Sequence, residues 1–477
     1  MGGVMPSEGH DHDSCGRHGG ALAEPPAAGY RVRYRGLPRT RRRRIGAVLL
    51  MPLVPAVTGL LLLYVLWPTH WTQGGGGRRW LVLADSLTLV SVGLVELFLL
   101  ANVAAVAYAL SVARDPVPVT PEPGRVLAFL TTYTPGSEPL STVRAALEGA
   151  VRMRHPGPLD VWLLDEGDDP EARMLCAELG VHHFTRHGVP EWNQETGPHR
   201  AGTKHGNVNA WLAKHGDAYD LVASVASGHV PRPEALERMT GYFRDPDIAF
   251  VVGPRVHGGE ARAAGPSQLL SDALAQLAGN RHGAPLFDGT DKVARVAALR
   301  QAGGFQGSVT GAPATGFVIH RLRNPLTGRY WRSVHTADAR ADGKRPVSWA
   351  DWSTQRPRRS REACGTLLRQ YGKALFRVRP GRLLSYTLTL ARRPVEAATS
   401  LFGVLSCVLV LTHTQSRVWA LLALMTALVP LVLRSLTLLR RPGARGAADR
   451  SRTVRPAPEP EPVLAAAVGA SPPAGGN

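Results

Sequence analysis

The 477-residue sequence predicts an α/β domain with a mostly parallel sheet and helices on both faces, flanked by two pairs of transmembrane helices. Two observations lead to this prediction. Between residues 125 and 252, short continuous apolar stretches typical of buried strands alternate with helical patterns. Two long apolar runs precede this middle segment and two more follow it.

The middle segment predicts a regular succession of strands and helices. We expect strands at Arg125–Thr134, Leu159–Asp165, Val181–Thr185, Leu221–Val225 and Ile248–Val252. We expect helices at Ser141–Met153, Pro170–Leu179, Lys204–His215 and Pro233–Phe243. Ligands of such sheets bind at the carboxyl ends of the parallel strands, so the loops after Thr132, Asp165 and Val225 are the places to seek a site.

The four apolar runs predict membrane spans. They are Ile45–Trp67, Trp80–Ala113, Val395–Thr412 and Val418–Leu439, which give a first helix pair in residues 45–113 and a second in 394–440. Arginines cluster before the first run, at 39 and 41–44, and after the last, at 440, 441 and 445. The positive-inside rule therefore predicts a multi-pass protein of the plasma membrane, in contact with the lipid bilayer, with both termini and the middle segment cytoplasmic.

The composition excludes several other classes of protein. The net charge of +19 is concentrated beside the apolar runs, and no basic stripe interleaved with aromatic residues predicts binding to nucleic acid. The four cysteines, Cys15, Cys176, Cys364 and Cys407, form no CxxC pair, so neither a zinc site nor a disulfide framework is indicated. We expect disorder in a basic, His-rich amino-terminal tail (1–44) and in the carboxyl-terminal tail (441–477).

The order of several short motifs resembles the membrane-embedded family 2 glycosyltransferases of the cellulose-synthase-like kind. The motifs are TTYTP at 131–135, LLDEGDD at 163–169, KHGNVN at 204–209, HVP at 229–231 and a QxxR at 355–358. The resemblance covers about residues 125–379. It implies a cytosolic GT-A-like domain (120–345), an interfacial helical segment with QxxR (346–393), and inverting transfer from a UDP-sugar to a polysaccharide.

The resemblance also implies which residues bind the donor: Thr131, Tyr133, Asp165, Lys204, Asn207, Asn209, Gln355 and Arg358. Asp165 would accept hydrogen bonds from the base or ribose; alternatively, it is an acidic turn residue that caps the next helix. Lys204 would neutralise the diphosphate; alternatively, it is an exposed lysine at a helix start. Trp192 and Trp211 could stack on a base or sugar, but we expect both to be buried aromatic residues.

The sequence departs from the family at three places that carry chemistry. The Asp-x-Asp pair that holds Mg²⁺ or Mn²⁺ is replaced at Ala226 and Gly228, so no metal cofactor is expected. The catalytic base of the Thr-Glu-Asp motif is replaced by Ala312, which leaves no catalytic residue intact. The tryptophan after QxxR is replaced by Arg359. Asp288 and Asp291 are the carboxylates closest in the sequence to Ala312, the position of the missing base.

These replacements predict a degenerate enzyme. Loss of a general base alone typically lowers the rate 10²–10⁴-fold, which is about 3–5 kcal/mol in activation free energy. Loss of the metal raises the barrier by several kcal/mol in addition. We therefore expect a pseudoenzyme that acts as a partner of an active polysaccharide synthase. Two alternatives remain open: an active, metal-independent inverting transferase that uses Lys204, Arg356, Arg358 and Arg359 on the diphosphate, and a membrane scaffold that binds no nucleotide.

Overall fold

The computed structural model describes residues 21–26, 29–36, 60, 79–136, 139–226, 228–254, 273–306, 312–338, 342–343, 378–391, 395, 398 and 401–402. By compactness, the chain ends Met1–Arg17 and Arg440–Asn477 separate from the unit His18–Leu439. All of the described residues belong to this second unit.

A seven-stranded mixed sheet forms the centre of the fold, in the order β10-β8-β9-β6-β3-β4-β5. The strands are β3 (Leu127–Tyr133), β4 (Leu159–Asp165), β5 (His182–Thr185), β6 (Leu221–Val225), β8 (Ile248–Val252), β9 (Asp291–Arg295) and β10 (Arg332–His335). Neighbours run parallel except at β9, which pairs antiparallel with both β6 and β8. The predicted mixed α/β fold with a mostly parallel sheet is confirmed.

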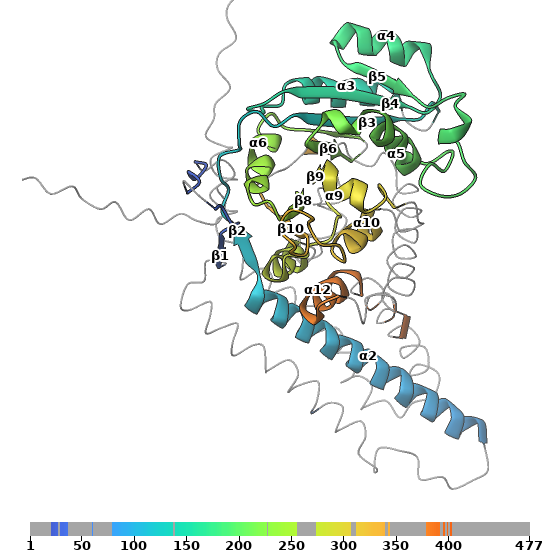
Figure 1. The fold of residues 1–477 in the computed structure, drawn as a ribbon. Helices are drawn as coiled ribbons and strands as arrows, with labels where there is room; N and C mark the ends of the chain where they lie inside the picture. Colours follow the sequence, from blue (N-terminus) through green and yellow to red (C-terminus); the bar gives the residue numbers. More distant parts are fainter. Residues whose placement is uncertain are drawn as a thin grey trace, which may run out of the picture. The chain divides into compact units, whose positions relative to one another are not determined.

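Helices cover both faces of this sheet (Figure 1). On one face, α3 (Leu140–Val151), α4 (Pro170–Leu179) and α6 (Ala235–Thr240) pack on a cluster that includes Phe129, Leu147 and Leu163. On the other, α5 (Lys204–His215), α9 (Val296–Gln301) and α10 (Ala312–Ile319) pack on a cluster that includes Trp211 and Phe250. Strands buried on both faces explain the continuous apolar runs in the sequence.

Local signals in the sequence set the helix ends. Asp169 caps α4 by accepting a hydrogen bond from the Glu171 amide, Pro170 occupies the first turn, and Gly180 ends the helix at φ 64°. Thr203 caps α5 in the same way, through the amide of Gly206. These devices lie at the predicted boundaries, and the bounds of β4, β6, β8, α4 and α5 agree with prediction.

The predicted helix Pro233–Phe243 is shorter in the structure. It divides into α6 and a 3₁₀ turn, Gly241–Arg244. A Cβ atom at Gly241 would overlap the carbonyl oxygen of Val119, because the backbone at Val119 lies directly against Gly241.

Part of the amino-terminal tail is folded onto the domain, contrary to the expected disorder of residues 1–44. Strand β1 (Tyr34–Gly36) pairs antiparallel with β2 (Arg114–Pro116). Tyr30 and Val32 are buried in the core of the α3 face. Arg31 forms ion pairs with Asp245 and Asp247, both of which are fully buried. The sequence prediction failed because the tail's apolar contacts lie with residues far along the chain.

Three elements outside the central sheet complete the described fold. A second small ribbon pairs β7 (His229–Val230) with β11 (Asp342–Gly343). Helix α2 (Arg79–Val112) contains a stretch, Gly93–Val112, that is long and apolar enough to cross a membrane, and it coincides with the second predicted span. Helix α12 (Pro380–Leu390) packs through Leu383, Tyr386 and Leu390 on Leu286 and Phe317. The other predicted spans lie almost wholly outside the described residues.

Candidate functional site

Polar side chains gather at the carboxyl edge of the parallel strands. The β3–β4–β5 register places Tyr133, Asp165 and Thr185 side by side at this edge. Residues opposite each other in a sheet point to the same face, here the face covered by α3. The edge selected from the sequence therefore does bring the ends of several strands together.

Asp165 is fully buried at the end of β4. Its Oδ1 accepts a hydrogen bond from the Gly167 amide (3.0 Å) and its Oδ2 accepts one from the Asp169 amide (2.6 Å). The His183 Nε2 lies 3.2 Å from the same Oδ2. Asp165 thus holds the turn that follows β4, and it does not cap α4, because Asp169 does so.

Tyr133 is linked to the same turn. Its hydroxyl donates to Asp169 Oδ2 at 3.0 Å. Burial and the neighbouring Asp169 carboxylate raise the pKa of Tyr133 to about 12, so the hydroxyl stays protonated. The turn after β4 is therefore fixed to the end of β3 by a side-chain bond as well as by the sheet.

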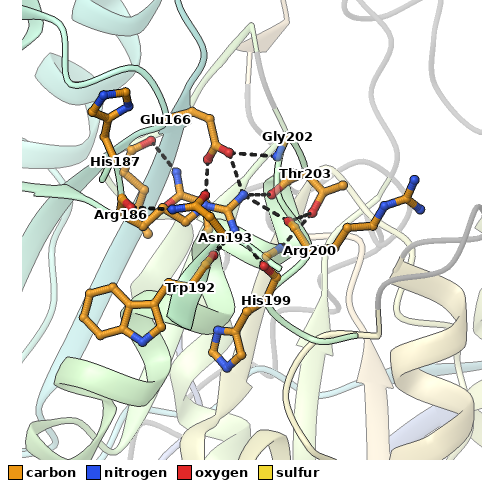
Figure 2. A network of polar contacts seen from close by, with 12 residues as sticks. Glu166, Arg186, His187, Trp192, Asn193, His199, Arg200, Gly202 and Thr203 are labelled. Atoms are coloured by element: carbon orange, nitrogen blue, oxygen red, sulfur yellow. Dashed lines mark hydrogen bonds and ion pairs between the residues drawn. The ribbon is translucent and has the colours of Figure 1, made fainter. Parts of the chain in front are cut away.

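A buried ion pair organises the long loop between β5 and α5 (Figure 2). Arg186, with no exposed side-chain surface, donates to both carboxylate oxygens of Glu166, at 3.0 and 2.5 Å. The same guanidinium donates to four backbone carbonyls of the loop, those of Trp192, His199, Arg200 and Thr203. Sequence analysis did not select this pair; the available signal was Glu166 beside Asp165, with an arginine directly after β5.

The loop leads directly into the predicted diphosphate-binding segment, which begins at Lys204. Lys204 is the first residue of α5 and is exposed, at a helix amino terminus that faces the sheet edge. A Cβ atom at Gly206 would overlap the Arg200 carbonyl oxygen, so only glycine fits at this position in the first turn of the helix. The arrangement presents a lysine and the amides of a helix start on a rigid support.

The two asparagines of the segment have different surroundings. Asn207 is buried and donates to the Leu164 carbonyl oxygen (3.3 Å), while its Oδ1 has no hydrogen-bond partner in the described part of the chain. Asn209 is fully engaged with backbone: it donates to Pro198 and Phe305 carbonyls and accepts from the Phe305 amide. Asn209 therefore anchors α5 to the loop at 303–305.

A small pocket lies beside the turn after β6. It has an empty volume of about 270 Å³, including its open mouth, and is lined by Thr131, Thr132, Thr142, Val143, Ala146, Val225, Ala226 and Gly228. The Thr131 hydroxyl is buried and finds no hydrogen-bond partner among the described residues. Gly228 has a φ of +77°, a conformation that favours glycine.

A carboxylate lies on the strand next to this turn. The antiparallel β6–β9 register pairs Val225 with Asp291, and the Ala226 amide donates to the Thr290 carbonyl oxygen at 2.9 Å. Asp291 is only 5% exposed and shares the face of Val225. The sequence could not place Asp291, since its position depends on an antiparallel strand arriving from residues far along the chain.

Comparison with known proteins finds relatives over part of the chain. No protein-family profile matches the chain. One stretch is 34% identical over 146 residues to the UDP-forming cellulose synthase catalytic subunit of Xanthomonas axonopodis pv. citri, covering 30% of this chain and 18% of that protein. Another alignment, to cellulose synthase 1 of Komagataeibacter xylinus, is 28% identical over 237 residues and covers 45% of this chain and 14% of that protein. The chain is a relative of the cellulose-synthase-like family 2 glycosyltransferases.

The aligned parts span less than a fifth of the length of these two relatives. Among solved structures, a mannosyltransferase from Pyrobaculum calidifontis in complex with GDP-Man and Mn²⁺ is 15% identical. Its TM-score is 0.48, and the match covers 75% of this chain and 97% of that one.

The turn after β6 in this cellulose-synthase-like chain does not fit a divalent cation. Mg²⁺ and Mn²⁺ prefer carboxylate oxygens, but Ala226 and Gly228 offer no side-chain ligand. The oxygens lining the pocket belong to neutral threonine hydroxyls. Neither position of the replaced pair therefore supplies a charged side chain with which to hold a cation against a diphosphate.

A second group of residues could hold an ion. Ligand atoms of Asp165, Asp168 and His183 lie within 4.8 Å of one another. Each carboxylate is already engaged, Asp165 with two backbone amides and Asp168 with Arg173. The hydrogen bond and charge of Arg173 hold the pKa of Asp168 below its usual range. These contacts explain why the two carboxylates lie together: both take part in the hydrogen bonds and ion pairs around the turn after β4.

The remaining predicted residues fall in different places. Ala312, at the position of the missing base, is the first residue of α10. Gln355, Arg358 and Arg359 lie outside the described residues. Trp211 is fully buried in the core, as expected, and Trp192 is partly buried, 5.9 Å from the Phe184 ring centroid, so neither is a free stacking surface.

Proposed function

We propose that the chain is a membrane-anchored, cellulose-synthase-like protein that binds a nucleotide sugar and transfers its sugar weakly or not at all. The observation that carries the proposal is the turn after β6. It lacks both carboxylates, and its backbone has a left-handed residue at Gly228. Neither Ala226 nor Gly228 therefore supplies a side chain that could hold a cation at this turn.

Donor binding is supported by the ends of β3 and β4 and by the loop that precedes α5. Asp165 and Tyr133 are held rigidly at the edge, and the Arg186–Glu166 pair fixes the loop that leads to Lys204. Rigid support of this kind is costly to build, and it is what a diphosphate-binding lysine needs. A nucleotide sugar, with a UDP-sugar as the first choice, is the proposed ligand.

Chemistry is where the site is incomplete. In an inverting transfer, an acceptor hydroxyl attacks the anomeric carbon, a base takes its proton, and the diphosphate leaves against positive charge. Ala312 cannot take a proton, and Ala226 and Gly228 cannot hold the counter-charge. In our proposal the chain serves as a partner or regulator of an active polysaccharide synthase in the plasma membrane.

A second candidate function is favoured by Asp291. This buried carboxylate lies next to the pocket, opposite Val225. It would act as a relocated base in a metal-independent transferase, with Lys204 and the arginines near 356–359 facing the diphosphate. Replacement of Asp291 by asparagine would then abolish any release of UDP by the intact chain.

The test measures UDP binding by calorimetry and UDP release from a panel of UDP-sugars, with and without Mg²⁺ or Mn²⁺. Lys204→Met should weaken UDP binding roughly tenfold, because a charged phosphate contact is lost. Lys214→Met, in the last turn of the same helix, is the matched control and should bind normally. Equal binding by the two variants would contradict the phosphate contact of Lys204, absence of UDP binding by the unaltered chain would contradict a nucleotide site, and UDP release by the unaltered chain would contradict impaired transfer.

A gain-of-function variant completes the experiment. Ala226→Asp with Ala312→Asp returns one metal ligand and the base without altering Gly228. An aspartate at Gly228 would occupy a left-handed conformation that costs about 1–2 kcal/mol for a residue with a side chain. We expect UDP release to appear in the double variant if the donor fold is intact.

A further inference from the structure

Three arginine side chains surround one tyrosine ring near the first turn of α12. The guanidinium carbon of Arg323 lies 4.4 Å from the Tyr330 ring centroid, and those of Arg379 and Arg382 each lie 5.5 Å from it. Arg323 and Tyr330 also pair as an antiparallel bridge. We call these four residues the Tyr330 cluster.

The positive charges of the cluster have no carboxylate beside them in the described part of the chain. Arg382 is only 6% exposed, and its one hydrogen bond is to the His320 carbonyl oxygen (2.7 Å). Arg323 donates to the Gly328 carbonyl oxygen. The nearby buried acids, Asp245 and Asp247, form their ion pairs with other arginines.

Like charges held this close repel one another. Burial lowers the pKa of Arg382, and the charges of Arg379 and Arg332 lower it further. The faces of aromatic rings attract cations, but each such contact contributes only about 0.5–2 kcal/mol. The amino terminus of α12, which begins at Pro380 directly after Arg379, adds further positive potential. An anion is the group that would relieve this arrangement.

The cluster lies at the end of the candidate membrane helix. Tyr108, in the last turns of α2, hydrogen-bonds to His282 at 2.9 Å, and His282 packs so closely on α12 that a Cβ atom at Gly381 would overlap its ring. The same end of α2 packs through Ala109 and Leu110 on Leu274 and Ala278. The first turn of α12 therefore adjoins the terminus of the stretch that could cross a membrane.

A loop tip next to the cluster adds an apolar contact. Between the paired residues Arg323 and Tyr330 the chain forms a short hairpin, and its Leu326 is 89% exposed. An exposed leucine flanked by arginines suits a surface where lipid headgroups meet acyl chains. A single exposed leucine carries little weight alone, but here it is beside the cationic cluster.

We propose that the Tyr330 cluster binds a phosphate group, with the headgroup of an anionic membrane lipid as its source. Guanidinium groups of Arg323, Arg379 and Arg382 match phosphate oxygens in charge and geometry. The proposal that a phosphate group binds rests only on the four residues of the Tyr330 cluster. The lipid source rests in addition on the membrane anchoring proposed above.

The experiment compares phosphate sources on the full chain purified in neutral detergent. Thermal stability is titrated with dioleoyl phosphatidylglycerol, with dioleoyl phosphatidylcholine, and with sodium phosphate at constant ionic strength. Arg323→Gln with Arg379→Gln removes two exposed members of the cluster, and Arg33→Gln with Arg152→Gln, both exposed and outside the cluster, is the charge-matched control. The first pair should raise the half-saturating phosphatidylglycerol concentration roughly thirty-fold, about five-fold for each arginine.

The possible results separate the two parts of the proposal. Saturable stabilisation by phosphatidylglycerol that only the cluster variant loses would support the lipid site. An equal, competing response to sodium phosphate would support the anion site but overturn the lipid source. Equal responses of both double variants, or of phosphatidylcholine and phosphatidylglycerol, would overturn the proposal. The sodium phosphate arm remains informative even if the chain proves not to be membrane-anchored.

Discussion

Arg186 shows how a single buried residue supports a site that it does not line. Its guanidinium joins Glu166, next to Asp165, to the loop that ends at Lys204. Removal of one partner from a buried ion pair leaves the other charge uncompensated, which costs about 3–5 kcal/mol. Arg186→Met should therefore lower the thermal stability strongly and weaken UDP binding.

The control for Arg186 is an exposed pair on the neighbouring helix. Arg173 pairs with Asp168, and its side chain is 55% exposed, so Arg173→Met should change the melting temperature little. The double variant Arg186→Met with Glu166→Gln removes both charges and should regain part of the loss. If Arg186→Met and Arg173→Met had equal melting temperatures, the buried pair would not be a major support of the loop.

His335 makes the fold sensitive to acid. It is fully buried at the end of β10, and neither ring nitrogen has a hydrogen-bond partner within the described structure. Burial lowers its pKa to about 4, below the usual value near 6.5. The unfolded chain therefore binds the extra proton first, and stability present above pH 6.5 is lost as the pH falls toward 4.

At pH 5 this loss amounts to about 2 kcal/mol. His335→Leu places an apolar side chain at this buried position and loses no side-chain hydrogen bond. The variant should therefore have nearly the same stability as the natural chain at pH 7.5 and a higher stability at pH 5. Melting temperatures at the two pH values test this. His320, whose pKa is also lowered by burial, leaves some acid sensitivity in both proteins. Identical pH profiles would contradict the assignment to His335.

Among the elements, the folded part of the amino-terminal tail has the clearest consequence for stability. Arg31 is the counter-charge of the buried Asp245 and Asp247, and the Val32 amide donates to Asp245 as well. Arg31→Gln should destabilise the protein by about 1–3 kcal/mol, since two buried carboxylates lose a charged hydrogen bond. Arg33→Gln, an exposed neighbour two residues on, should change the melting temperature little. Equal melting temperatures would show that the segment docks without stabilising the domain.

The elements that are predictable share one property: their signals are local. Strand β4 and helices α4 and α5 are bounded by turns, an aspartate cap and a glycine that can be read within a few residues. Strand β9 and the β1–β2 ribbon depend on partners 40 or more residues away. No local pattern distinguishes an antiparallel strand inserted into a parallel sheet.

The same distinction applies to the site. Asp165, Lys204 and Tyr133 can be found in the sequence because motifs follow strands, and strands in a parallel sheet end at one edge. The hydrogen bonds of Asn209 with Pro198 and Phe305 could not be predicted, because a motif gives residue types but not where a side chain points. Asp291 and Arg186 escape prediction because their positions depend on contacts between distant segments.

For the whole molecule, the remaining prediction is the membrane anchor. The twenty-residue stretch Gly93–Val112 has a mean hydropathy of 1.9, and at 1.5 Å per residue it spans roughly the 30 Å of a bilayer core. Exposed apolar residues continue along α2, with Leu87, Val90 and Leu97 each at least half exposed. Water is a poor environment for such a surface, so we expect the full chain to stay with the membrane pellet in carbonate at pH 11.

Orientation can be measured in the same preparation. Because arginines flank the outer apolar runs on the side of both termini, alkaline phosphatase fused to either end should be inactive, whereas a fluorescent protein fused there should fold and fluoresce. A chain released by carbonate would contradict the anchor. An active phosphatase at either end would contradict the cytoplasmic placement, and with it the access of the domain to cytosolic nucleotide sugars, because a UDP-sugar made in the cytosol would then lie across the membrane from Lys204.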